Sequence, residues 1–170
     1  RIKVLVHETG EERFRELVEA EWEAIRDGSL GLPEEDVALI RARFTPYDYE
    51  APVDFTTEQE TLRRENPDFD TWIEQQLAEH KQPGYAIVNI SCTPIGKPPG
   101  DISSDQMEAV ADLADAYSLS EMRVTHNQNL VFANVRQQDL FALWQGLVKI
   151  GLATANHGLI SDTICCPGLD

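Results

Sequence analysis

The order of elements that follows Tyr85 limits most strongly what this chain can fold into. Residues 85–91 are an apolar run of strand length, and residues 107–117 repeat apolar side chains at helical spacing. Two more short apolar runs, around Val124 and at residues 130–132, flank a polar stretch and predict two further strands. A second amphipathic helix is expected over residues 140–148. This β-α-β-β-α order is most of a split βαβ unit.

We therefore expect an α+β fold, in which a ferredoxin-like half-domain follows an N-terminal helical extension. Such a unit places both helices on one face of an antiparallel sheet, and the other face must be covered by something. Residues 1–80 are the only other large segment in this sequence. We expect another domain or a ligand on that face, and we expect the chain to self-associate through it.

The first eighty residues predict a less compact region. Residues 1–7 alternate between apolar and other side chains, which indicates a half-buried strand. Apolar residues at helical spacing follow over residues 14–25, and Pro33 is suited to open a short helix. Residues 44–67 contain several prolines without a periodic apolar pattern and are predicted to be irregular. Asn66-Pro67 is a typical helix start.

Two local signals complete the predicted elements. Ser103 and Gln106 have the spacing of a capping box, in which the side chain of each residue accepts a hydrogen bond from the backbone N–H of the other. A last strand is expected over residues 159–165.

Charge and cysteine content narrow the functional classes. The formal net charge is −16, which argues against nucleic acid as a partner because phosphate contacts need clustered Lys and Arg. No apolar run approaches the length of a membrane span, so no membrane partner is expected. The cysteines are Cys92, Cys165 and Cys166, an odd number with an adjacent pair, which is a poor disulfide framework. A reducing, cytoplasmic location is predicted.

The polar stretch between the two short strands carries the chemistry. A two-residue turn needs little more than one Asn and one Gly. This stretch has no Gly and supplies many donors and acceptors, from Thr125, His126, Asn127, Gln128 and Asn129. It is either a solvated turn or the wall of a binding site. His126 is interpreted as a solvated loop residue, and the four histidines show no metal-ligand spacing.

Two motifs together resemble the sirohaem-dependent nitrite and sulfite reductases. One is Arg123-x-Thr125-x-Asn127-Gln128-Asn129, and the other is Cys166-Pro167-Gly168-Leu169-Asp170. The opening Arg1–Val6, followed by Gly10, also looks like the end of a first catalytic half in these repeated enzymes. Neither end looks like a natural terminus, and we expect the chain to be a central fragment of a longer protein.

The resemblance implies a division of the chain into four parts. Residues 1–26 would be the closing strand and helix of the preceding catalytic half, and residues 27–82 the connection between repeats. Residues 83–152 would be the ferredoxin-like half-domain. Residues 153–170 would begin a second domain that holds sirohaem and a 4Fe-4S cluster.

The resemblance also implies site residues and an activity. Cofactor-binding roles fall on the hairpin residues Arg123, Thr125, Asn127, Gln128 and Asn129. Cys166 matches the first cysteine of a Cys-x5-Cys pair that ligates the 4Fe-4S cluster, and its partner would lie beyond Asp170. Amide and hydroxyl donors suit the many carboxylates of sirohaem, and thiolates suit iron–sulfur clusters. No catalytic residue is assigned in this chain.

The implied parent enzyme reduces sulfite to sulfide or nitrite to ammonia with six electrons. Its partners would be the remainder of the parent chain and a small electron donor, either a ferredoxin or a flavoprotein. The fragment alone is expected to be inactive and to bind no cofactor. The alternative is a non-catalytic ferredoxin-like protein-interaction domain, in which Cys166 is a small buried apolar residue.

Overall fold

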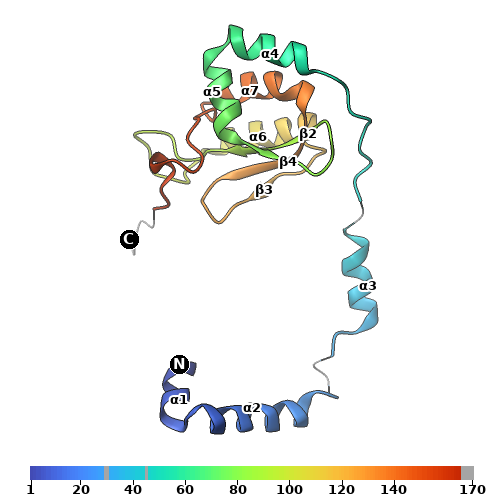
Figure 1. Cartoon of the computed structure of the whole chain (residues 1–170), viewed down its shortest axis with the longest axis vertical. Helices are drawn as coiled ribbons and strands as arrows, with labels where there is room; N and C mark the ends of the chain where they lie inside the picture. Colours follow the sequence, from blue (N-terminus) through green and yellow to red (C-terminus); the bar gives the residue numbers. More distant parts are fainter. Residues whose placement is uncertain (29–30, 45, 166–170) are drawn as a thin grey trace. The chain divides into compact units, whose positions relative to one another are not determined.

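The computed structural model describes residues 1–28, 31–44 and 46–165, and the chain divides into two compact units. The first unit, Arg1–Asp48, contains the helices α1 (Ile2–Thr9), α2 (Glu11–Ile25) and α3 (Glu34–Ala42). No described residue of these helices is buried. The helices predicted over residues 14–25 and after Pro33 are confirmed as α2 and α3 (Figure 1).

The strand predicted over residues 1–7 is wrong, because Ile2–Thr9 is the helix α1. A strand must pair its N–H and C=O groups with a neighbour. The described part of the first unit contains no other strand, whereas a helix satisfies these groups within its own segment. Alternating apolar residues alone therefore did not decide the structure of this segment.

The second unit, which begins at Tyr49, is built on a four-stranded antiparallel sheet. Its strands are β1 (Leu77–Glu79), β2 (Tyr85–Ile90), β3 (Arg123–Val124) and β4 (Leu130–Arg136), in the spatial order β1-β2-β4-β3. The helices α5 (Pro67–Gln76), α6 (Ser104–Tyr117) and α7 (Leu140–Lys149) pack with this sheet (Figure 1). The α+β fold and its ferredoxin-like β-α-β-β-α order are as predicted.

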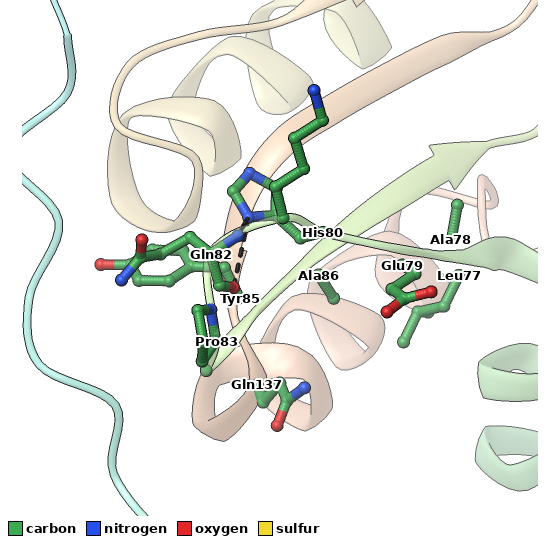
Figure 2. Close-up of a pocket in the computed structure, with 11 residues that line it drawn as sticks. Leu77, Ala78, Glu79, His80, Gln82, Pro83, Tyr85, Ala86 and Gln137 are labelled. Carbon is green, nitrogen blue, oxygen red and sulfur yellow. Dashed lines mark hydrogen bonds between the residues drawn. The ribbon is translucent and has the colours of Figure 1, made fainter.

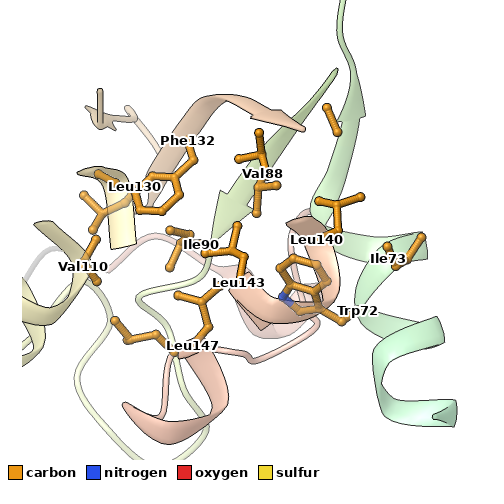
Figure 3. Packing of buried hydrophobic residues seen from close by; sticks show 14 of the residues in the cluster. Trp72, Ile73, Val88, Ile90, Val110, Leu130, Phe132, Leu140, Leu143 and Leu147 are labelled. Carbon is orange, nitrogen blue, oxygen red and sulfur yellow. The ribbon is translucent and has the colours of Figure 1, made fainter. Parts of the chain in front are cut away.

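One hydrophobic core joins the sheet to the three helices. Val88 and Phe132 meet in register on the two central strands, and Leu143 of α7 packs on the same face (Figure 3). The register between β2 and β4 shifts between Ala86 and Val88, which marks a β-bulge. Buried residues of α5, α6 and α7 all belong to this one cluster.

Helix α5 contributes more to this core than the sequence indicated. Trp72 is fully buried and Phe69 nearly so. The ring of Phe69 lies 5.0 Å from that of Phe141 and 5.4 Å from that of Trp144, centroid to centroid. The packed unit is therefore larger than the half-domain expected at residues 83–152.

Several elements differ from the sequence prediction. Part of the irregular region expected at residues 44–67 is helix α4 (Thr56–Glu65), and the short strand β1 was not predicted. The last strand, expected over residues 159–165, is wrong because Ile160–Asp162 is a single 3-10 turn. In this turn Ile160 is 95% exposed, while the side chain of Asp162 turns inward to accept hydrogen bonds.

The sheet face opposite the core is partly covered by the chain itself. The Tyr49 hydroxyl lies 2.8 Å from Oδ1 of Asn134 and donates to it, and the backbone N–H of Glu50 donates to the Tyr85 hydroxyl at 3.1 Å. Arg136 also forms an ion pair with Glu50. No helix in the described ranges is both long and apolar enough to cross a membrane.

Candidate functional site

The turn between β3 and β4 is held by the side chain of Thr125. Its hydroxyl accepts hydrogen bonds from the backbone N–H groups of Asn127 (3.3 Å) and Asn129 (3.2 Å) and donates to the carbonyl of Asn129 at 3.1 Å. The Thr125 N–H donates to the same carbonyl at 2.9 Å. Thr125 therefore fixes the shape of the hairpin, and its hydrogen-bonding capacity is used within the turn.

Gln128 binds the segment that leads to the second motif. Its side-chain Nε2 donates to the carbonyl of Cys165 at 2.9 Å, and its Oε1 accepts from the Cys165 N–H at 3.0 Å. A side-chain amide that pairs with both backbone groups of one residue sets that residue's position and orientation. The hairpin is thus joined to the residue that precedes Cys166. Cys166 itself lies outside the described residues.

Asn129 is buried and points into the molecule. Its Oδ1 accepts from the N–H of Cys92 at 2.9 Å, and its Nδ2 donates to Oδ1 of Asp162 at 2.8 Å. It is 1% exposed. Asn129 therefore links the end of β2 to the segment that carries Cys165, and its side chain makes these contacts from behind the hairpin surface.

Asp162 is a nearly buried carboxylate surrounded by donors. Besides Asn129, it accepts from the Thr93 hydroxyl at 3.1 Å and from the Gly158 N–H at 2.9 Å. Nδ1 of His157 lies 3.4 Å from Oδ2. Burial alone would raise the pKa of Asp162, but the hydrogen bonds from Asn129, Gly158 and Thr93, together with nearby His157, lower the pKa below its ordinary value.

Further side chains complete this network around Asp162. Nδ2 of Asn156 donates to the hydroxyl and the carbonyl of Thr93, both at 3.1 Å. The backbone N–H of His157 donates to Oε1 of Gln76, at the end of α5, at 2.8 Å. The loop before Cys165 is therefore tied to β2, to the hairpin and to α5.

The other predicted site residues lie closer to the surface. The Arg123 side chain is 60% exposed and is paired with Glu121. Asn127 is half-buried and His126 is exposed. Residues 122–130 supply guanidinium and amide donors and contain no acidic side chain, and the carboxylate that pairs with the Arg123 guanidinium comes from Glu121 just before them. This donor set fits a ligand that carries several carboxylates.

The five hairpin residues thus separate into two groups. Thr125, Gln128 and Asn129 are used in contacts within the protein, while Arg123 and Asn127 lie nearer to solvent. Asp162, Thr93 and Asn156 were not predicted from the sequence. Isolated polar residues of this kind give no signal until the fold brings them together, since Thr93 and Asp162 lie 69 positions apart.

Metal ligation cannot be completed within the described part of the chain. No group of three or more His, Cys, Asp or Glu side chains there could hold a metal ion. Cys92 is buried, and burial raises the pKa of its thiol, whereas Cys165 is exposed.

A separate cavity of about 600 Å³ lies at the turn between β1 and β2 (Figure 2). His80 is part of its lining, and Nδ1 of His80 accepts from the backbone N–H of Gln82 at 2.9 Å. The rings of His80 and Tyr85 lie 5.9 Å apart, centroid to centroid. Because Tyr85 begins β2 and Cys92 follows its end, this cavity is distinct from the hairpin site.

The fold and the hairpin define a ferredoxin-like half-domain joined to a cysteine-bearing segment. Residues 93–150 match the sequence model of a family described as the nitrite/sulfite reductase ferredoxin-like half domain. This part of the chain, which includes helices α6 and α7 and the hairpin between β3 and β4, is therefore similar to that half domain.

Two relatives agree with this assignment. The chloroplastic ferredoxin–nitrite reductase of Betula pendula is 30% identical over 89 residues, which are 52% of this chain and 14% of that protein. The chloroplastic ferredoxin–nitrite reductase of Spinacia oleracea is 29% identical over 89 residues. The chain thus spans 14% of the length of each of these relatives.

Proposed function

We propose that this chain is a central part of a sirohaem-dependent reductase that converts nitrite to ammonia or sulfite to sulfide with six electrons. The observation that carries the proposal is the double hydrogen bond between Gln128 and Cys165. It joins the first motif of the family resemblance to Cys165, the residue that precedes the second motif and lies 37 positions further along the chain. A solvated turn has no need of such a contact.

Each hairpin residue then has a separate task. Arg123 and Asn127 would donate to the carboxylates of sirohaem, and Gln128 would hold the backbone that enters the cluster-binding segment. Thr125 and Asn129 would keep the hairpin in shape. Cys166 would supply one thiolate to a 4Fe-4S cluster, and sirohaem and the cluster would supply the redox chemistry when bound.

The remaining parts of the proposal concern the longer protein. Residues 1–26, 27–82, 83–152 and 153–170 would be, in order, the end of one catalytic half, the connection, the half-domain and the start of the second cofactor domain. The names of the two relatives support a ferredoxin as the electron donor. We propose a cytoplasmic location on the cysteine pattern. The chain alone would be inactive, because the other cluster ligands and the substrate-binding residues lie outside it.

The test is to purify the full-length protein from a host that makes sirohaem. The proposal expects Soret and charge-transfer bands, bound iron, and reduction of nitrite or sulfite by a reduced ferredoxin. Arg123→Ala should lower the sirohaem absorbance. The charge-altering control Gln145→Glu, on the exposed side of α7, should leave the absorbance unchanged.

A protein that contains neither iron nor sirohaem would contradict the proposal. That outcome would favour the alternative, a non-catalytic protein-interaction domain whose polar hairpin meets another protein.

A further inference from the structure

We propose that Asn129 and Asp162 are positioning residues, which together fix the backbone segment that leads to Cys165, called here the cysteine segment. This inference rests on the proposed function for its purpose, because it explains how the hairpin could hold a cluster-binding segment. It assigns to Asn129 a role different from direct contact with a cofactor. It also assigns a role to Asp162, which lies outside both sequence motifs.

The Asn129 side chain points into the protein. Both of its polar atoms are used inside the protein, one by the Cys92 N–H and the other by the Asp162 carboxylate. The residue is 1% exposed. A buried amide whose donor and acceptor are both satisfied by protein groups is committed to those groups, since breaking either bond would leave a buried polar atom unpaired.

Asp162 lies three positions before Cys165, at the end of a loop that begins after α7. Its two oxygens accept from three different segments, represented by Thr93 after β2, Asn129 in the hairpin and Gly158 in the loop itself. A carboxylate that closes three segments around itself determines where the following residues can lie.

Gln128 adds a second contact between the hairpin and the cysteine segment. Gln128 and Asn129 are neighbours, and they bind Cys165 and Asp162, which are separated by two residues. The hairpin therefore holds the cysteine segment at two points. The outer point, Gln128, touches the backbone of Cys165 directly, and the inner point is buried. If the inner point is lost, only the outer one of these two contacts remains between the hairpin and the segment.

The charges of this pair allow a sharp test, in which the two side chains are swapped between the positions. Asn129→Asp places a second carboxylate against Asp162, which repels it. Asp162→Asn removes the charge but leaves an amide N–H₂ facing the Gly158 or Thr93 donors. The double variant N129D/D162N restores one amide and one carboxylate in contact, with the positions reversed. A merely space-filling role would not be rescued in this way.

The measurement on this chain is the rate of amide hydrogen exchange at Cys165, whose N–H donates to Gln128. In Asn129→Asp we expect hydrogen exchange at Cys165 to be at least about tenfold faster. In the double variant N129D/D162N the rate should return to within about threefold of the original. Gln145→Glu, which adds the same charge on α7, should leave the rate unchanged. The amides of β2 report in each variant whether the sheet is still folded.

Two results would overturn the assignment. One is unchanged exchange at Cys165 in Asn129→Asp with the sheet intact. The other is a double variant N129D/D162N in which hydrogen exchange at Cys165 is as fast as in Asn129→Asp. If Asn129→Asp does not fold, folding of the double variant N129D/D162N decides the question. A folded double variant supports the assignment, and an unfolded one contradicts it.

Iron content in the full-length protein separates this inference from the proposed function. If the unsubstituted protein contains iron, Asn129→Asp should lose the iron and the double variant N129D/D162N should regain it. If the unsubstituted protein contains no iron while exchange at Cys165 is rescued, the proposed function fails and the positioning of the segment stands. Iron present without rescue would overturn the positioning role alone.

Discussion

At the scale of single residues, Asp162 shows how a buried charge is retained in a strongly acidic chain. Its carboxylate accepts from Asn129, Thr93 and Gly158 and lies beside His157. These contacts favour the ionised form, so the pKa in the folded protein lies below the ordinary value of 3.8. The carboxylate therefore stabilises the fold only when it is ionised.

This gives a prediction about pH. Because the folded-state pKa is lowered, the contribution of Asp162 is fully present above the unfolded-state pKa and is lost as the pH falls through the folded-state pKa. Asp162→Asn should lower the free energy of unfolding by about 1–3 kcal/mol above pH ~5. The difference between the two proteins should shrink below pH ~4. Urea unfolding of both proteins at a series of pH values measures it, and a difference that does not change with pH would contradict the prediction.

Two glycines with similar backbones predict different costs of substitution. Gly84 has φ +84° and Gly151 has φ +72°, so alanine is strained at both. A Cβ at Gly84 would also lie 2.8 Å from Cβ of Pro52, whereas one at Gly151 would meet nothing within 4 Å. Gly151→Ala should cost about 1 kcal/mol, and Gly84→Ala at least about 1 kcal/mol more. Chemical denaturation of the two variants tests this, and equal costs would show that Pro52 yields freely.

At the scale of elements, the sequence was informative where an apolar stripe met a core. Helices α6 and α7 have such stripes and were predicted correctly. Helix α4 has no buried residue, and β1 has only three residues, so neither produced a periodic signal. Residues 1–7 had the period of a strand but no partner strand in the described part of their unit. Pairing partners are a property of the fold, and a local pattern does not contain them.

The same limit applies to the hairpin. Its excess of hydrogen-bonding groups is visible in the sequence, and the family resemblance implies cofactor-binding roles for Gln128 and Asn129. Their partners were not visible, because Cys165 and Asp162 lie 37 and 33 positions away. The sequence therefore singled out the hairpin but did not predict the direction of the Asn129 side chain.

The start of α6 offers a local test of an element. Ser103 and Gln106 form the capping box that their spacing predicts, with hydrogen bonds of 3.0 and 3.2 Å. Ser103→Ala should lower the free energy of unfolding by about 1 kcal/mol, because it leaves a helix N–H without a partner. Ser104→Ala, one position inside the helix, is the matched control and should be close to neutral. If the two variants are equally stable, the cap contributes nothing.

At the scale of the whole molecule, the division between Asp48 and Tyr49 predicts which part folds alone. A chain that begins at Tyr49 should keep the melting temperature of the full chain, because no described residue of helices α1, α2 and α3 is buried. A chain that begins at residue 83 should not fold, because it lacks Phe69 and Trp72 of the core, each of which contributes about 3–5 kcal/mol. Calorimetry on the two truncated chains tests this. Cooperative unfolding of the shorter one would show that α5 is dispensable.

Self-association remains a prediction at this scale. The sheet face away from the helices is covered only in part, and Ile87 and Val131 are half-buried there. Because the net charge is −16, association should strengthen as added salt screens the repulsion between copies. Sedimentation at rising protein and salt concentration measures it. A mass of 19.1 kDa under all conditions would contradict the prediction.

The backbone of Gln128 has a consequence for the evolution of this chain. Its φ of +59° lies in the left-handed region, which Gly or Asn would occupy at lower cost. Its side chain holds Cys165, and neither Gly nor Asn has the length to do so. Selection for thermal stability alone would therefore replace Gln128, whereas selection for the joined site would keep it. A Gln found at this strained position in a variant library would then mark the members in which the hairpin still holds the cysteine segment.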